Sequence, residues 1–333
     1  MRSLKNHHRL VRTAAIAAVT TAIAACGSGT PEPGASSATG GGPKLAVVAT
    51  TPEVADFVRN VGGSDVEVTQ IIKPNVDPHD YEPTPADLQA IASAKLVVKS
   101  GVGLEEWLDR TIESAGFTGT VVDSSQGVTL REGGHEEEGE HAGEKGEEHA
   151  GEEEHDPHIW HDPRNAKIMV TNIQKGLAAA EPAKAGAFAK NLATYSAELD
   201  KLDSDNTAAW AKIAKADRKL VTNHDAFGYY IARYELEFVG SVIPSLDTSA
   251  ELSAKQLTDL VAKIKATGTK AIFAESSLPP KTAEAIAQQA GVKVVAGQDA
   301  LFGDSLGAPG SPEGTYLGAE RHNTQVIVDA LAG

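Results

Sequence analysis

Three histidines lie in loops beside strongly patterned segments, far apart along the chain. His79 comes after the apolar run VTQII, His158 lies in DPHIWHDP at the start of a long helical stretch, and His224 comes after KLVT. A single loop histidine is more often a surface or structural residue than a ligand. Three of them at the ends of separate elements favour a shared metal site, because neutral imidazoles bind zinc and related transition metals.

A tetrahedral site built on three histidines needs a fourth donor, and only carboxylates remain for that role. Asp304 follows the last strand signal in LFGDSLG, and Glu275 ends another strand signal in FAESS. Glu275 could instead accept a hydrogen bond from the second ring nitrogen of a ligand histidine and thereby fix its tautomer. The residue pattern by itself leaves both assignments open.

The elements that must position these residues form two α/β blocks with a helical region between them. Short β-branched runs alternate with helical spacing over residues 44–125 and again from residue 219 onward. This alternation predicts parallel sheets flanked by helices, with ligands bound at the carboxyl ends of the strands, in the crevice between the blocks. Asp162-Pro163 is a strong helix-start signal. We predict a first lobe over 44–180, a long rigid connecting helix over 181–216 and a second lobe over 217–333.

The N-terminal segment indicates export. Four basic residues precede the short apolar run TAAIAAVTTAIAA, which ends at Cys26. We predict a lipoprotein signal peptide over 1–25, cleavage before Cys26 and acylation of its thiol, and then a flexible Gly/Ser/Pro-rich tether over 26–43. The protein is therefore expected outside the cytoplasm, anchored by lipid to the outer face of the cytoplasmic membrane. Cys26 is the only cysteine, so no intramolecular disulfide can form.

Residues 132–156 form a separate acidic segment. It holds eleven Glu, one Asp and one Lys in a chain whose net charge is −16. Because the segment has no apolar face to bury, we expect a disordered loop. Its histidines either capture metal weakly near the site or belong to a spacer that only adds solubility; they are His135, His141, His149 and His155. The negative charge argues against nucleic-acid binding through phosphates.

Five motifs carry a resemblance to a known family. NVDPHDYEPTPADL, VGLEEWLDR, DPHIWHDPRNA, TNHDAFGYY and GDSLG resemble, in this order, the zinc/manganese solute-binding proteins of ABC importers (cluster A-I), including the zinc-uptake lipoproteins. The resemblance covers essentially the whole body of the chain. It implies two Rossmann-like lobes joined by a long helix, with Zn²⁺ in the cleft as the transported ligand. It also implies a monomer that delivers metal to an ABC permease and its cytoplasmic ATPase. The implied ligands are His79, His158, His224 and Asp304.

One position departs from the family pattern. His161 stands where an apolar residue usually follows the tryptophan of the His-x-Trp motif. The motif position favours His158 as the ligand and leaves His161 as the alternative, or as a side chain that turns to the cleft mouth or to solvent. Relatives selective for manganese tend to have a carboxylate where His224 stands. The histidine at this position and the His/Glu-rich loop therefore favour Zn²⁺ over Mn²⁺.

Two other classes of function fit the sequence less well. A zinc-dependent hydrolase keeps three protein ligands and an open position for water. Here four donors are available, and the sequence has no H-E-x-x-H helix that would supply a general base. A surface adhesin is compatible with a lipoprotein but has no motif of its own. We therefore expect a metal carrier and not an enzyme.

Overall fold

The computed structural model describes residues 43–133, 155–248, 250 and 253–333. The predicted signal peptide, Cys26 and nearly all of the tether lie outside the described residues, as do His135, His141 and His149. Within these described ranges, no helix has both the length and the apolarity needed to cross a bilayer.

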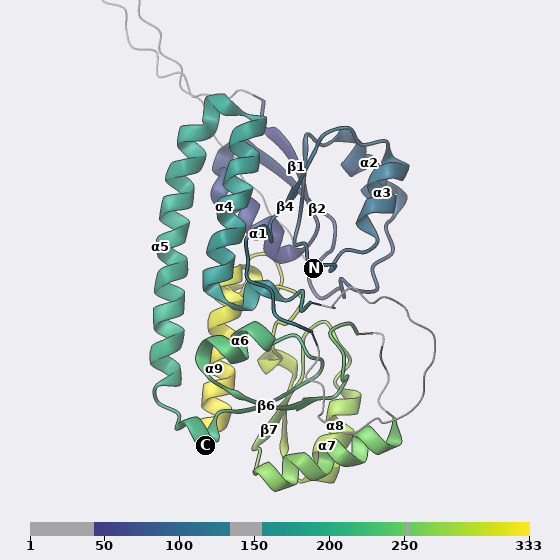
Figure 1. Cartoon of the computed structure of the whole chain (residues 1–333), viewed down its shortest axis with the longest axis vertical. Helices are drawn as coiled ribbons and strands as arrows, with labels where there is room; N and C mark the ends of the chain where they lie inside the picture. The colour runs from purple at the N-terminus through teal and green to yellow at the C-terminus, as the bar shows by residue number, and fades with distance from the viewer. Residues whose placement is uncertain (1–42, 134–154, 249, 251–252) are drawn as a thin grey trace, which may run out of the picture. The chain divides into compact units, whose positions relative to one another are not determined.

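Two parallel four-stranded sheets form the framework, and they share one topology (Figure 1). In the first lobe the strand order is β2-β1-β3-β4, and in the second it is β6-β5-β7-β8. The strands of the first sheet are β1 (Leu45–Ala49), β2 (Val66–Gln70), β3 (Leu96–Lys99) and β4 (Thr120–Asp123). Those of the second are β5 (Lys219–Thr222), β6 (Glu237–Ser241), β7 (Ala271–Phe273) and β8 (Lys293–Val295). In both lobes the first and third strands in chain order are neighbours, so their carboxyl ends form a switch point where ligands bind in such sheets.

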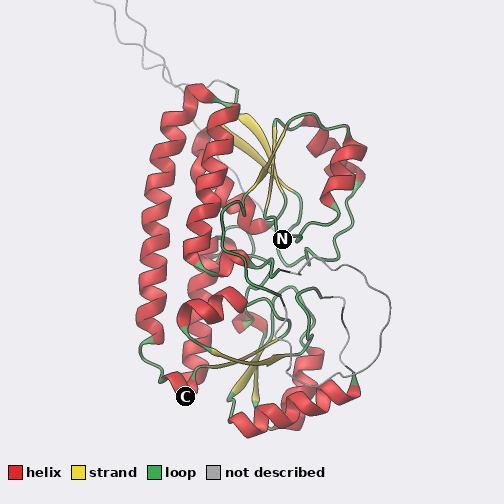
Figure 2. Ribbon diagram, in the orientation of Figure 1, coloured by secondary structure: helices red, strands yellow, loops and turns green. Residues whose placement is uncertain are grey.

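Parallel neighbours need crossover connections, and helices supply them (Figure 2). The first lobe has α1 (Pro52–Gly62), α2 (Pro85–Ser93) and α3 (Leu108–Ala115), and the second has α6 (Gly228–Tyr234), α7 (Ala254–Thr267) and α8 (Lys281–Ala290). The central strands β1 and β3 are mostly apolar and buried because both sheet faces are covered there, whereas the edge strands β2 and β4 have exposed residues. In β1, for example, Val47 and Ala49 join one buried cluster and Val48 joins another.

The helical region predicted between the lobes consists of two long helices. The predicted start at Asp162-Pro163 is confirmed: α4 (Pro163–Ala180) has Asp162 as its N-cap, and the Asp162 side chain accepts a hydrogen bond from the backbone N–H of Arg164. The longer helix α5 (Ala185–Trp210) has 26 residues and a length of about 39 Å.

Two helices have residues in the cores of both lobes. On α5, Leu199 packs in the core of the first lobe and Trp210 in that of the second. The C-terminal helix α9 (Tyr316–Ala332) does the same with Tyr316 and Ile327. This shared packing could not be predicted from the sequence, since the periodicity of a helix does not tell which core each turn contacts. The lobes are thus joined by two packed helices.

Candidate metal centre

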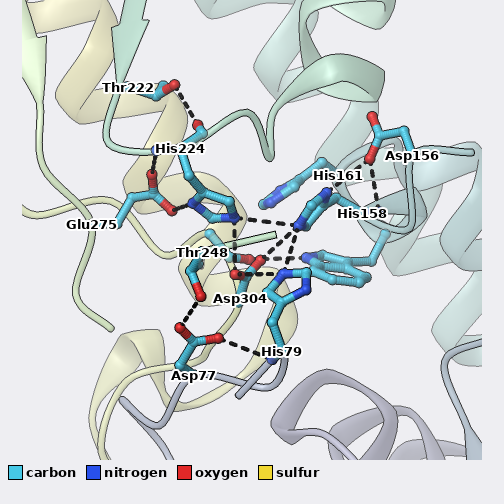
Figure 3. Close-up of polar contacts among 12 residues, drawn as sticks. Asp77, His79, Asp156, His158, His161, Thr222, His224, Thr248, Glu275 and Asp304 are labelled. Atoms are coloured by element: carbon cyan, nitrogen blue, oxygen red, sulfur yellow. Dashed lines mark hydrogen bonds and ion pairs between the residues drawn. The ribbon is translucent and has the colours of Figure 1, made fainter. Parts of the chain in front are cut away.

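The four residues that the resemblance implied as ligands converge at the carboxyl ends of the two sheets (Figure 3). One donor atom of each lies within 4.8 Å of the others; the residues are His79, His158, His224 and Asp304. The loops after β2, β5 and β8 supply His79, His224 and Asp304, and His158 directly precedes the short 3₁₀ turn Ile159–His161. The His79 side chain is 10% exposed, while the other three are fully buried.

The distances between donor atoms match those around a small tetrahedral ion. His158 Nε2 lies 3.3 Å from His79 Nε2 and 3.3 Å from His224 Nε2. An ion held at the ~2.0–2.1 Å typical of zinc–nitrogen bonds separates neighbouring ligand atoms of a tetrahedron by about 3.3–3.4 Å. His158 Nε2 is therefore spaced from both other imidazoles as in a shared ion site, and the three Nε2 atoms lie within 4.8 Å of one another.

Asp304 supplies the fourth donor at similar distances. Its Oδ2 lies 3.0 Å from His224 Nε2 and 3.4 Å from His79 Nε2, and its Oδ1 lies 3.2 Å from His158 Nε2. The indole N–H of Trp160 donates to the carbonyl of Gly303 at 3.1 Å, which fixes the backbone next to Asp304. A Cβ at Gly303 would come within 2.2 Å of Glu275 Oε2, so this close approach requires glycine.

Two of the three imidazoles are oriented by carboxylates behind them (Figure 3). His158 Nδ1 lies 2.8 Å from Asp156 Oδ1, and His224 Nδ1 lies 2.8 Å from Glu275 Oε2. Glu275 Oε1 also accepts the backbone N–H of His224 at 2.9 Å. An acceptor at Nδ1 places the proton there and leaves Nε2 free for a metal. Glu275 thus lies behind His224, outside the group of four, while Asp304 lies within it.

His79 is positioned through its backbone. Its N–H donates to Asp77 Oδ1 at 2.9 Å, and the other oxygen of Asp77 accepts the hydroxyl of Thr248 from the second lobe. The backbone N–H of Asn75 donates to Ser305 Oγ, also in the second lobe, at 2.6 Å. The loop that carries His79, the most exposed of the four residues, is therefore hydrogen-bonded to the loops of the second lobe that carry Thr248 and Ser305.

The roles of the aspartates in these loops were not predicted, although the sequence carries a signal for them. The tripeptide Asp-Pro-His occurs at 77–79 and again at 156–158. In both copies the aspartate accepts the backbone N–H of the histidine two residues later, at 2.9 Å for His79 and 3.0 Å for His158. This short local turn holds the histidine in place without any distant partner.

The charges of the cluster favour protonated imidazoles in the metal-free protein. Burial by itself lowers the pKa of His158, but the Asp304 and Asp156 carboxylates raise it to about 9. Burial also opposes the charge of His224, whose pKa is nonetheless raised well above its usual value by Asp304 and Glu275. Burial raises the pKa of Asp304, yet His224 and His158 hold that pKa well below the usual range. A cation that enters must therefore displace protons.

His161 lies apart from this group, and the expectation that it turns to the cleft mouth or to solvent is wrong. Its side chain is fully buried, with Nδ1 2.7 Å from Oε1 of Glu320 and its ring stacked on Phe227. The reason is tertiary, because the partners that enclose the ring, Glu320 on α9 and Phe227 beside α6, are distant in sequence. His155, the described histidine of the acidic segment, forms a single antiparallel bridge with Glu132 and also lies outside the group.

Comparison with known proteins identifies the family. The model of the family described as "ZnuA: Zinc-uptake complex component A periplasmic" matches residues 47–330. The chain belongs to this family. The resemblance to the cluster A-I solute-binding proteins of ABC transporters, and the predicted fold of two α/β lobes with a long helix, are thereby confirmed.

Relatives of this ZnuA-family chain carry names that refer to different metals. The zinc-binding protein TroA of Treponema pallidum is 33% identical over 291 residues, which are 87% of this chain and 89% of TroA. Its solved structure covers 87% of this chain and 99% of the TroA chain, with a TM-score of 0.75 and 30% identity. The manganese-binding lipoprotein MntA of Bacillus subtilis (strain 168) is 32% identical over 292 residues, 86% of this chain and 90% of MntA. The iron ABC transporter substrate-binding lipoprotein MtsA of Streptococcus pyogenes serotype M1 is 29% identical over 297 residues, 87% of this chain and 89% of MtsA.

Proposed function

We propose that this ZnuA-family protein captures Zn²⁺ outside the cytoplasmic membrane and delivers it to an ABC permease driven by a cytoplasmic ATPase. Its ligands are His79, His158, His224 and Asp304. The observation that carries the proposal is the convergence of three imidazole Nε2 atoms and one carboxylate at the spacing of a tetrahedral ion. The geometry of the metal-binding group in this chain supports zinc, and the name of TroA agrees with it.

The choice of zinc rests on the chemistry of the donors. Three neutral imidazoles and one carboxylate suit a borderline ion in tetrahedral geometry, whereas manganese prefers oxygen ligands and higher coordination. Manganese is the alternative cargo, since MntA is named for it. Zn²⁺ also binds more tightly than Mn²⁺ at almost any site of nitrogen and oxygen donors. Selectivity against manganese is therefore expected to be strong.

A carrier function agrees better with the site than catalysis does. Four protein donors complete a tetrahedral shell, so no position remains for the activated water of a zinc hydrolase. Release must then come from a change in the protein. Because α5 and α9 pack in both cores, we expect small loop rearrangements on docking at the permease instead of a wide hinge motion. Movement of the loop that carries His79 would require its hydrogen bonds to Thr248 and Ser305 of the second lobe to break.

The membrane anchor belongs to the same proposal. MntA and MtsA are named lipoproteins, and the sequence before Cys26 has the features of a lipoprotein signal. With acylation of Cys26, the protein would act as a monomer tethered near its permease. A Cys26→Ser substitution is expected to move the protein from the membrane fraction to the soluble fraction. Retention in the membrane fraction would argue against the anchor.

The deciding experiment is a competition titration of the soluble body with a chelator of known zinc affinity. Each of His79→Ala, His158→Ala and His224→Ala is expected to weaken zinc binding strongly. His322→Gln serves as the control, because His322 lies on α9 and its Nε2 contacts the carbonyl of Ala300 instead of the site. Tighter binding of Mn²⁺ than of Zn²⁺, or native zinc affinity in the His224→Ala protein, would refute the proposal.

The acidic loop needs a separate measurement. Its histidines either raise the local zinc concentration through weak binding or have no part in metal capture. Deletion of residues 132–154, followed by measurement of zinc stoichiometry, separates the two ideas. Loss of weak additional sites supports capture, while an unchanged stoichiometry supports a spacer.

A further inference from the structure

The two turns that carry His158 and His224 touch each other through a second pair of rings. His161 lies three residues after His158, and Phe227 lies three residues after His224. Their rings are stacked, with centroids 4.5 Å apart and planes inclined by 23°. One ring belongs to the 3₁₀ turn ahead of α4 and the other to Phe227, the N-cap residue directly before α6. The stack therefore joins the same two segments that must hold their ligand atoms 3.3 Å apart.

The stacked ring of His161 is held from a third side by the C-terminal helix. Its Nδ1 is hydrogen-bonded to Oε1 of Glu320 at 2.7 Å. Glu320 lies on α9, next to Ala319 of the first core and about two turns before Ile327 of the second. The rings of His161 and Phe227 are fully buried, and Glu320 is only 2% exposed. A hydrogen bond to a fixed acceptor sets the plane of the imidazole, which an apolar side chain in the same place could not do.

We propose that His161 is a positioning residue: its ring, stacked on Phe227 and oriented by Glu320, fixes the distance between the turns that carry His158 and His224. The inference rests on the proposed zinc function and adds to it the means by which this chain prearranges ligands from two lobes. This positioning role also explains why a histidine stands where the family resemblance led us to expect an apolar residue.

Two double variants test this role. In the first, His161→Ala with Glu320→Met removes the ring together with the carboxylate that would otherwise be buried without a partner. In the second, His161→Phe with Glu320→Met keeps a stacked ring without the hydrogen bond. Phe188→Leu is the matched control, because Phe188 is fully buried on α5 in the first core and is not part of the metal centre.

The measurements are zinc affinity by chelator competition, the absorption spectrum of the Co²⁺-loaded protein and the melting temperature without metal. The first double variant is expected to bind zinc about 10–100-fold more weakly, as is usual when a group that orients a ligand is lost. Its Co²⁺ spectrum should shift as the ligand geometry changes. The second double variant should recover part of the affinity, because phenylalanine keeps the stack on Phe227 but lacks the hydrogen bond that sets the ring plane. The Phe188→Leu protein should melt earlier but keep both.

Several results would overturn the inference. If the first double variant binds zinc with native affinity and an unchanged Co²⁺ spectrum, His161 has only a structural role. If the second is as weak as the first, the ring does not set the spacing. Should the first variant fail to fold, Phe227→Leu removes the stack alone and is measured in the same way. A native protein that does not bind zinc refutes the proposed function itself, whereas native binding with unaffected variants refutes only the positioning role.

Discussion

The affinity of the site for zinc should rise steeply with pH, because the metal must displace protons from histidines that the surrounding carboxylates keep charged. Three carboxylates lie against the buried cluster: Asp304 beside the Nε2 atoms, Asp156 behind His158 and Glu275 behind His224. They raise the pKa of His158 to about 9 and that of His224 well above its usual value, against the opposing effect of burial. Imidazole binds metal only in its neutral form.

The magnitude follows from these pKa values. Below pH 9 zinc binding releases a proton from His158, so the binding constant changes about tenfold per pH unit, or ~1.4 kcal/mol. Between pH 8 and pH 6 this proton alone weakens zinc binding about 100-fold. A second proton from His224 raises the loss to as much as ~10⁴-fold over the same interval. For the metal-free protein the sign is reversed: histidines with raised pKa values stabilise the fold below about pH 6.5, and this stabilisation is lost as pH rises through 9.

Chelator competition at several pH values measures the slope, after correction for protonation of the chelator. Calorimetry at pH 7 in two buffers of different ionisation enthalpy counts the protons directly, and we expect one to two per zinc ion. Glu275→Gln provides an internal comparison, because it removes one carboxylate that raises the pKa of His224 and should lower the proton count. Zinc affinity that stays constant between about pH 6 and pH 8, with no proton release, would refute a site built on three histidines.

Three further outcomes are expected. Glu275→Gln should lower zinc affinity about 10–100-fold at pH 8 in competition titrations. The control substitution Glu284→Gln, at an exposed residue of α8, should leave zinc affinity unchanged. Equal effects of the two substitutions would show that Glu275 has no role in zinc binding. Thr248→Val deletes the hydroxyl that donates to Asp77. Loss of this hydrogen bond, ~1 kcal/mol, should speed zinc dissociation roughly fivefold in stopped-flow chelation. An unchanged dissociation rate would show that this contact does not help to hold the ion. Leu199→Ala, fully buried on α5, should lower the free energy of unfolding by about 2–5 kcal/mol in urea denaturation while zinc affinity is kept. A parallel loss of affinity would show that the site and the core are coupled.

Much of the framework could be predicted from local patterns. The strand and helix periodicities gave the alternating elements of both lobes, and Asp162-Pro163 gave the start of α4. These features depend on residues close in sequence, so the sequence alone is informative about them. The packing of α9 against both cores was not predictable in the same way, because its partners include residues far away in the chain, such as Asp56 and Trp160 beside Tyr316.

The sequence by itself determined the donors and the loops that carry them: histidines and carboxylates at the ends of strands, with Asp-Pro-His turns that fix two of the histidines locally. Only the tertiary structure decided which donors meet. It directs Asp304 to the three Nε2 atoms and places Glu275 behind His224. It also places His158 in the cluster and turns His161, three residues on, to Glu320. The physical reason is that a metal centre is defined by distances of about 3 Å between residues from two lobes, and those distances are fixed by the packing of the lobes and not by any local pattern.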